Sequence, residues 1–140
     1  IPVTLKTVTD DLGVKKDVSS FVIPVGATIN MDGTAIMQGL ATMFIASTAG
    51  VDLSMIEYLQ IVLLAMVASI GAAAVPSAGT ITLALILSSL GLPLDAIGLI
   101  LAVDRILDMI RTSVNVTGDS AIACIVADSE NLLDKEVFNK

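Results

Sequence analysis

Five polar and charged side chains recur near the C-terminal end of the sequence at spacings of three or four residues. They are Asp104, Asp108, Arg111, Asn115 and Asp119. An α-helix advances about 100° per residue, so these side chains fall within a sector of about 80°. Carboxylates, an amide and a guanidinium on one helix face can bind a cation or a small zwitterion, because each charge of such a ligand finds an opposite partner.

The other face of this predicted helix is mainly apolar and carries Ile106, Met109, Ile110, Ser113 and Val114. A soluble amphipathic helix would have the same two faces, with the charged face in water. This stripe, however, follows long uncharged segments and contains Asp and Asn rather than Lys and Glu. Ionisable residues inside a membrane normally face a cavity and mark a substrate or ion pathway. We therefore interpret the stripe as the wall of a chamber within a bilayer.

The composition of the chain indicates a membrane protein. Of its 140 residues 55% are hydrophobic, yet it has no Trp, one Tyr and three Phe. Small residues interleaved with aliphatic ones suit helices that pack closely in lipid. The net charge of −7 indicates no particular partner, and we expect no nucleic acid. Cys124 is the one cysteine, which excludes an internal disulfide, and we expect it to be a buried apolar side chain.

A broken transmembrane helix is predicted over residues 18–50. An apolar half-span ends in Val25-Gly26-Ala27-Thr28, Asn30-Met31-Asp32-Gly33 interrupts it, and a second helical run begins at Thr34. A span needs about 20 apolar residues, and an acid, an amide and a glycine at its centre are poor helix formers. Broken helices expose backbone carbonyls that can bind a cation at the bilayer midplane.

A re-entrant helical hairpin is predicted over residues 54–92. Residues 58–94 contain no charge, and small residues with Pro76 form a turn in the middle. The limbs, residues 58–70 and 80–90, would be roughly 16 to 20 Å long as helices, which is too short to cross a core of about 30 Å. The alternative is two ordinary spans, which would place Pro76 in a water-exposed loop.

The last predicted element is an amphipathic transmembrane helix over residues 94–128, after the break at Gly91-Leu92-Pro93. Residues 1–17 are expected to be a surface connection and residues 129–140 a tail. Lysines occur only in these two ends of the chain, so the positive-inside rule predicts that both are cytoplasmic. The re-entrant hairpin and the alternative of two ordinary spans both satisfy this topology. The predicted fold class is an all-α membrane protein, and we expect the chain to be part of a longer multi-pass protein of the cell membrane, inner or plasma.

Three motifs resemble the glutamate/aspartate:sodium symporter family, which comprises the excitatory amino acid transporters and their prokaryotic relatives. The motifs are Asn30-Met31-Asp32-Gly33-Thr34, Ala68-Ser69-Ile70-Gly71 with Val75-Pro76-Ser77-Ala78-Gly79, and Asp104-Arg105-Ile106-Leu107-Asp108-Met109-Ile110-Arg111-Thr112 with Asn115-Val116-Thr117-Gly118-Asp119. The resemblance covers residues 21–128. It implies the seventh helix, second hairpin and eighth helix of a transport domain. It also implies that the first hairpin's tip, and a scaffold that forms homotrimers, lie outside this sequence.

For the substrate, the resemblance implies an acidic amino acid. Arg111 would hold the side-chain carboxylate and Asp108 would accept a hydrogen bond from the ammonium group. Thr112 and Asn115 would bind the backbone groups of the amino acid. Further walls of the pocket would be Thr34, Val75, Pro76 and Gly79.

For ions, the resemblance implies sodium coupling and no enzyme activity. One sodium ion would lie among the carbonyls of Gly26, Asn30 and Asn115 and the carboxylate of Asp119. A second would sit under the hairpin tip, on the backbone of Thr28, Ser69, Ile70 and Ala72. A third would use the interruption at Asn30, Met31 and Asp32. The hairpin would be the extracellular gate of an alternating-access cycle.

Several alternatives remain open at this point. A proton-coupled acidic amino acid symporter and a C4-dicarboxylate symporter fit the same stripe, and a passive cation channel could be lined by it. Met31-Asp32-Gly33-Thr34 is similar to the loop of aspartate-nucleophile phosphatases, but Asn30 stands where the nucleophilic carboxylate is needed. The glycosylation sequon Asn115-Val116-Thr117 would be inaccessible within a membrane helix.

Overall fold

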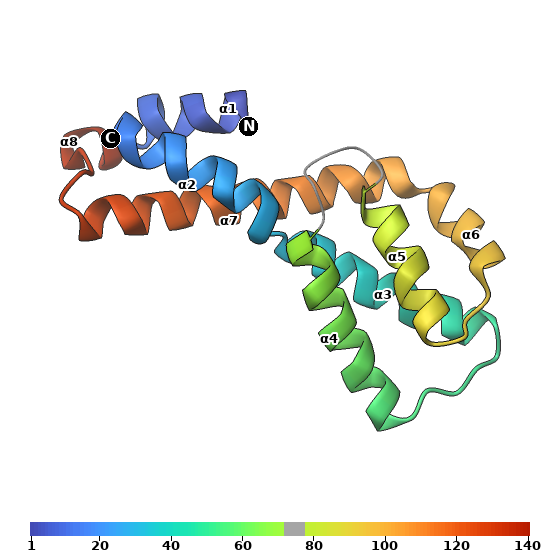
Figure 1. Cartoon of the computed structure of the whole chain (residues 1–140). Helices are drawn as coiled ribbons and strands as arrows, with labels where there is room; N and C mark the ends of the chain where they lie inside the picture. Colours follow the sequence, from blue (N-terminus) through green and yellow to red (C-terminus); the bar gives the residue numbers. More distant parts are fainter. Residues whose placement is uncertain (72–77) are drawn as a thin grey trace.

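The computed structural model describes residues 1–71 and 78–140, and this part of the chain is helical (Figure 1). The predicted all-α class is therefore confirmed. Among the residues described, no helix is at once long and apolar enough to cross a membrane. In chain order the elements are α1 (Pro2–Lys6), a π-helical turn (Thr7–Asp11), α2 (Lys16–Ile29), α3 (Asp32–Thr48), α4 (Met55–Gly71), α5 (Ala78–Ser89), a 3-10 turn (Leu94–Ala96), α6 (Ile97–Leu101), α7 (Asp104–Ser129) and α8 (Lys135–Phe138).

The long helix α7 organises the fold. Helix α2 packs along its C-terminal half and α3 along its N-terminal half, so these two helices follow one another beside a single partner (Figure 1). Helices α4 and α5 both contact α3, and the end of α4 approaches the junction between α2 and α3. The C-terminus lies near the C-terminal end of α7, and the N-terminus lies in the same half of the molecule at the free end of α1.

The helix interruption is shorter than the sequence predicts. Helix α2 ends at Ile29 and α3 begins at Asp32, so only Asn30 and Met31 lie between them. Their backbone angles, φ −105° and ψ 66° for Asn30 and φ −108° and ψ 53° for Met31, are outside the helical region. Asp32 belongs to the first turn of α3, where a carboxylate interacts favourably with the positive end of the helix dipole.

The prediction of one unbroken helix over residues 94–128 is wrong. A 3-10 turn and the short α6 precede α7, and Ala102 and Val103 separate the two helices. Val103 has φ −117° and ψ 1°, and its β-branched side chain has a reduced helix propensity. Asp104 then lies in the first turn of α7, so its charge favours a new helix start at this position.

Two apolar clusters lie on either side of the interruption. One joins α3, α5 and α6 and consists of Met37, Ala41, Ile45, Ala46, Leu83, Leu87, Leu92 and Ile100. The other joins the N-terminal segment, α2 and the end of α7 and consists of Val8, Val14, Val18, Ile23, Ala123 and Ala127. Neither cluster includes the residues of the interruption itself, so the helix break and the polar face of α7 meet between two apolar regions.

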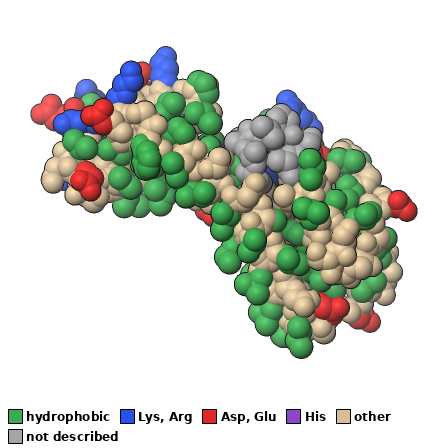
Figure 2. Space-filling view, in the orientation of Figure 1, with side chains coloured by type: hydrophobic (Ala, Val, Ile, Leu, Met, Phe, Trp, Pro, Cys, Tyr) green, Lys and Arg blue, Asp and Glu red, His purple; other side chains and the backbone are tan. Residues whose placement is uncertain are grey.

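Large apolar side chains also cover much of the outer surface (Figure 2). The exposed face of α7 carries Ile106, Met109 and Ile110, each 59 to 64% exposed, as the sequence pattern predicts. Exposed apolar residues on α3 and α4 add to this surface, and include Ile36, Leu40, Leu59, Val62 and Val67. A surface of this extent marks contact with lipid or with further protein.

Candidate functional site

The interruption between α2 and α3 lies against the Asp119 carboxylate of α7. The Nδ2 of Asn30 donates a hydrogen bond to Oδ1 of Asp119 over 3.0 Å. Two glycines permit this approach. A Cβ atom on Gly26 would overlap Oδ1 of Asp119 and lie 3.0 Å from its Cγ, and a Cβ on Gly118 would lie 2.8 Å from Nδ2 of Asn30.

Asp119 is a buried carboxylate, only 4% exposed, and it forms no ion pair with the described residues. A buried carboxylate without a counter-charge is unfavourable, so the site favours a bound cation. Within the described ranges, no three acidic, histidine or cysteine side chains converge on a metal position. A cation at this place would therefore be held by backbone and amide oxygens with one carboxylate. Such a donor set suits an alkali ion and does not suit zinc.

Asn115 links α7 to the start of α3 by hydrogen bonds. Its Oδ1 accepts a hydrogen bond from the backbone N–H of Gly33 over 2.8 Å, and its Nδ2 donates to Oγ1 of Thr34 over 3.3 Å. The helices are close at this point, because a Cβ atom on Gly33 would lie 2.6 Å from the carbonyl oxygen of Arg111. The amide thus satisfies one of the free N–H groups at the N-terminus of α3 and fixes its register on α7.

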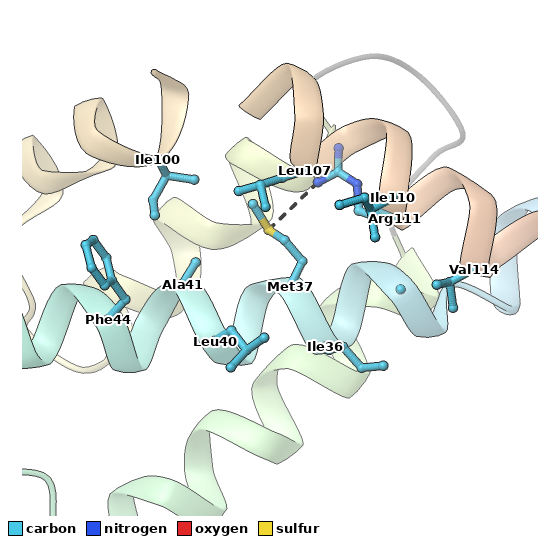
Figure 3. Close-up of a pocket in the computed structure, with 11 residues that line it drawn as sticks. Ile36, Met37, Leu40, Ala41, Phe44, Ile100, Leu107, Ile110, Arg111 and Val114 are labelled. Carbon is cyan, nitrogen blue, oxygen red and sulfur yellow. Dashed lines mark hydrogen bonds between the residues drawn. The ribbon is translucent and has the colours of Figure 1, made fainter. Parts of the chain in front are cut away.

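Arg111 is buried, with 7% of its surface exposed, and is the cationic group of the site. Its Nη2 forms an ion pair with Oδ1 of Asp108, whose side chain is 37% exposed. Its Nη1 lies 3.9 Å from Sδ of Met37 on α3 (Figure 3). The first turn of α5 closes a further side, because a Cβ atom on Gly79 would overlap Nη1 and lie 3.1 Å from Cζ.

A pocket of about 280 Å³ lies beside Arg111, between α3, α6 and α7 (Figure 3). Apart from Arg111, its lining is Gly33, Ile36, Met37, Leu40, Ala41, Phe44, Ile100, Leu107, Ile110 and Val114. Arg111 is the one predicted site residue among them. This pocket is therefore a neighbour of the predicted substrate position, and two walls predicted for that position, Val75 and Pro76, are outside the described residues.

The structure brings together eight of the predicted site residues. They are Gly26, Asn30, Thr34, Gly79, Asp108, Arg111, Asn115 and Asp119, which come from α2, the interruption, α3, α5 and α7. The polar face of α7 predicted from the spacing thus lies towards α2 and α3, as expected. Asp104 follows the same face, and its Oδ1 is buried without a hydrogen-bond partner among the described residues.

Other predicted residues stand apart from this group. Thr112 is exposed, Asp32 is exposed, and Ile70 is 49% exposed. The hydroxyl of Thr28 donates to the carbonyl of Val25, and that of Ser69, which is buried, donates to Met66 within α4. Met31, in contrast, contacts the group, because its buried sulfur accepts a hydrogen bond from the Thr34 hydroxyl over 3.5 Å. Ala72, also predicted to bind sodium, lies outside the described residues.

Three residues of the site were not predicted from the sequence: Gly33, Met37 and Gln38. Gln38 is fully buried on α3, one turn after Thr34, and donates from Nε2 to Oγ1 of Thr82 on α5. A lone amide inside an apolar run was a signal that could have identified it. Met37 offers no comparable signal, because a methionine among aliphatic residues is usually a core side chain.

Comparison with known proteins identifies the family to which the sequence is similar. The profile of the sodium:dicarboxylate symporter family matches residues 1–129. An excitatory amino acid transporter of Caenorhabditis elegans is 52% identical over 126 residues, which are 90% of this chain and 25% of that protein. Excitatory amino acid transporter 2 of Mus musculus is 53% identical over 126 residues, 90% of this chain and 22% of that protein. Excitatory amino acid transporter 1 of Rattus norvegicus is 48% identical over 140 residues, 100% of this chain and 25% of that protein. The chain thus spans about a quarter of the length of these relatives.

Proposed function

Because the chain belongs to the sodium:dicarboxylate symporter family, a family of transporters and not of enzymes, we propose that it forms the substrate and ion site of a sodium-coupled transporter for an acidic amino acid. The observation that carries this proposal is the buried Arg111 with Asp108 beside it. A guanidinium binds a carboxylate bidentately, and a neighbouring carboxylate binds an ammonium group. The pair therefore offers one partner for the acidic side chain of such a substrate and one for its amino group.

Without substrate, Arg111 and Asp108 neutralise each other. An entering amino acid exchanges this ion pair for two intermolecular ones, so both charges of the protein keep a partner and the α-carboxylate of the substrate is left to neutral hydrogen-bond donors. Thr112, which is exposed beside Arg111, and Asn115 bind the substrate's backbone groups in this proposal. Gly79 lies against the guanidinium and, with Val75, Pro76 and Thr34, completes the pocket.

Sodium fits the donor set around Asp119. The carboxylate is buried and forms no ion pair within the described chain, and the interruption beside it has non-helical backbone angles at Asn30 and Met31, as in broken helices that bind cations. We assign one sodium ion to Gly26, Asn30, Asn115 and Asp119. The second assignment, to Thr28, Ser69, Ile70 and Ala72, is supported by the contact between α2 and α4, and the third is to Asn30, Met31 and Asp32. When bound, sodium supplies the positive charge that the buried carboxylate lacks.

Helices α4 and α5 would be the limbs of the extracellular gate. The end of α4 approaches the junction between α2 and α3, and α5 contacts the Arg111 guanidinium through Gly79. A gate that closes preferentially on a neutralised pocket couples ion binding to substrate binding, because each ligand favours the same closed state.

The surroundings of this site would be a cell membrane and a homotrimer. The apolar outer faces of α3, α4 and α7 support contact with lipid and with further helices of the same protein. The placement of both termini in the same half of the molecule supports the even number of crossings that cytoplasmic ends require. In this proposal the interrupted α2–α3 pair and α7 are the transmembrane elements, and a scaffold elsewhere in the protein forms the trimer.

The test is uptake of radiolabelled aspartate by the full-length protein in proteoliposomes. An inward sodium gradient should drive accumulation, and replacement of sodium by potassium should abolish it. Accumulation driven by a pH gradient without sodium would indicate a proton-coupled symporter instead. Cation flux independent of substrate would indicate a channel, and stronger competition by succinate than by aspartate would indicate a dicarboxylate substrate.

The arginine assignment has a matched control on the same helix. Arg111→Cys should abolish aspartate uptake, because no other buried cation is described near the site. Arg105→Cys removes an exposed arginine one and a half turns earlier and should leave uptake near the wild-type value. Unchanged aspartate affinity in Arg111→Cys would contradict the assigned role.

A further inference from the structure

A buried amide links α3 to the proposed gate. Gln38 is fully buried, and its Nε2 donates a hydrogen bond to Oγ1 of Thr82 on α5. Within the described parts of the chain, the Oε1 of Gln38 has no hydrogen-bond partner. Burying an amide with one group unpaired costs free energy, and an apolar side chain of the same length would avoid that cost. The hydrogen bond to Thr82 is therefore what glutamine provides at this position and an apolar side chain would not.

The link continues from Thr82 to the substrate-binding arginine. The Oγ1 of Thr82 donates to the backbone carbonyl of Gly79 over 3.1 Å. Gly79 in turn lies directly against the guanidinium of Arg111, where a Cβ atom would be 3.1 Å from Cζ. A single path of contacts thus joins the middle of α3, the first turn of α5 and the cationic group of the site.

We propose that Gln38 is a positioning residue for the substrate site, acting through Thr82 and Gly79 on Arg111. The hydrogen bonds hold the first turn of α5 against α3, and the backbone at Gly79 then limits the positions open to the guanidinium. Loss of the link lets this turn move away and allows Arg111 more arrangements, so substrate binding is weakened. This inference rests on the proposed function for its substrate, but the link itself is independent of any ligand.

Three substitutions in the full-length protein test the link. Thr82→Val keeps the shape and removes the hydroxyl, Thr82→Ser retains the hydroxyl, and Gln38→Met removes the amide while keeping the length. The matched control is Thr42→Val. Thr42 is also fully buried on α3, one turn after Gln38, but its hydroxyl donates to the backbone carbonyl of Gln38 within its own helix.

Aspartate affinity and thermal unfolding are measured together. Loss of one hydrogen bond of ordinary strength corresponds to about a five- to tenfold change. Thr82→Val and Gln38→Met should weaken aspartate binding by this factor, while Thr82→Ser and Thr42→Val stay within about twofold of wild type. Gln38→Met should keep its unfolding temperature, because it also removes an unpaired buried oxygen. A parallel fall in affinity and unfolding temperature in Gln38→Met would overturn the positioning role, as would an equal loss in Thr42→Val.

Amide hydrogen exchange of ligand-free protein provides a readout that needs no substrate. Exchange in residues 78–83 should be about fivefold faster in Thr82→Val and Gln38→Met than in wild type and Thr42→Val. Faster exchange together with absent aspartate binding in the wild-type protein would support the link and refute the proposed substrate. Unchanged exchange in both variants would overturn the link itself, whatever the substrate.

Discussion

Gly26 on α2 lies directly against the carboxylate of Asp119 on α7, with no room for a side chain between them. A Cβ atom on Gly26 would be 3.0 Å from Cγ of Asp119, and it would overlap Oδ1. Because the carboxylate is the movable end of a short side chain, a larger residue at position 26 would displace it. The contact therefore connects the identity of one small residue to the geometry of the proposed sodium site.

Gly26→Ala should weaken sodium binding without abolishing folding. The displaced carboxylate would lose its aligned hydrogen bond from Asn30, so we expect a loss of tenfold or more in sodium affinity, corresponding to about 1.4 kcal/mol. Binding of ²²Na⁺ to the purified full-length protein measures this. Gly98→Ala, at a helical glycine with open space around it, is the control, and sodium affinity equal in the two variants would refute the site at Asp119.

Gly33→Ala should lower stability, because the close neighbour at this position is backbone. The added Cβ would lie 2.6 Å from the carbonyl oxygen of Arg111, so α3 and α7 would have to separate. Overpacking of this kind costs about 1–3 kcal/mol. Gly39→Ala is the matched change on α3, because a Cβ atom at position 39 would have no neighbour within 4 Å. Replacing glycine by alanine inside a helix stabilises the folded state by about 0.5–1 kcal/mol.

Thermal unfolding of the two variants in detergent should therefore shift in opposite directions relative to wild type. Equal unfolding temperatures for Gly33→Ala and the wild type would contradict the close packing of α3 on α7. The comparison needs no substrate or ion, so it tests the fold separately from the proposed function.

The sequence was sufficient to predict the polar face of α7 and a helix interruption near Asn30. Both follow from local patterns, namely three- and four-residue spacing and a cluster of poor helix formers. The break at Val103 was missed because one β-branched residue is a weak signal and the start of α7 at Asp104 depends on tertiary packing. The lone amide of Gln38 in an apolar run was a usable signal, but its hydrogen-bond partner Thr82, which is 44 residues away in the chain, could not be predicted from local pattern.

Asp108→Asn should separate amino acid binding from dicarboxylate binding. Asp108 both pairs with Arg111 and, in the proposed function, receives the substrate's ammonium group. Its neutral replacement removes the ammonium partner but leaves the guanidinium free for a carboxylate. We expect aspartate affinity to fall tenfold or more and succinate affinity to be unchanged or improved. Competition of succinate and of unlabelled aspartate against labelled aspartate is measured in Asp108→Asn and in the reference variant Arg105→Cys. Equal losses of affinity for the two compounds in Asp108→Asn would contradict the ammonium assignment.

Ser54 and Glu57 form a capping box at the start of α4, before the uncharged remainder of that helix. The Oε2 of Glu57 accepts hydrogen bonds from the hydroxyl and the backbone N–H of Ser54, each over 2.7 Å, and the Glu57 N–H donates back to the Ser54 hydroxyl over 3.4 Å. The hydroxyl, and then the backbone N–H, hold the pKa of the Glu57 carboxyl below its ordinary value. Since the pKa is lower in the folded state, the stabilisation is complete above the unfolded pKa of about 4.3 and is lost as the pH falls through the folded value.

Ser54→Ala should therefore lower the unfolding temperature at pH 6 to 7 and have a progressively smaller effect as the pH falls below about 4.3. Glu57→Gln should behave in the same way, because it removes the titrating group from the same cap. Ser89→Ala is the control, since that exposed hydroxyl donates only to the Leu85 carbonyl within α5 and its effect should not vary with pH. Scanning fluorimetry of the purified protein over this range measures the difference between each variant and wild type. A Ser54→Ala difference that stays constant from pH 7 to pH 3 would show that the carboxylate of Glu57 does not stabilise the start of α4.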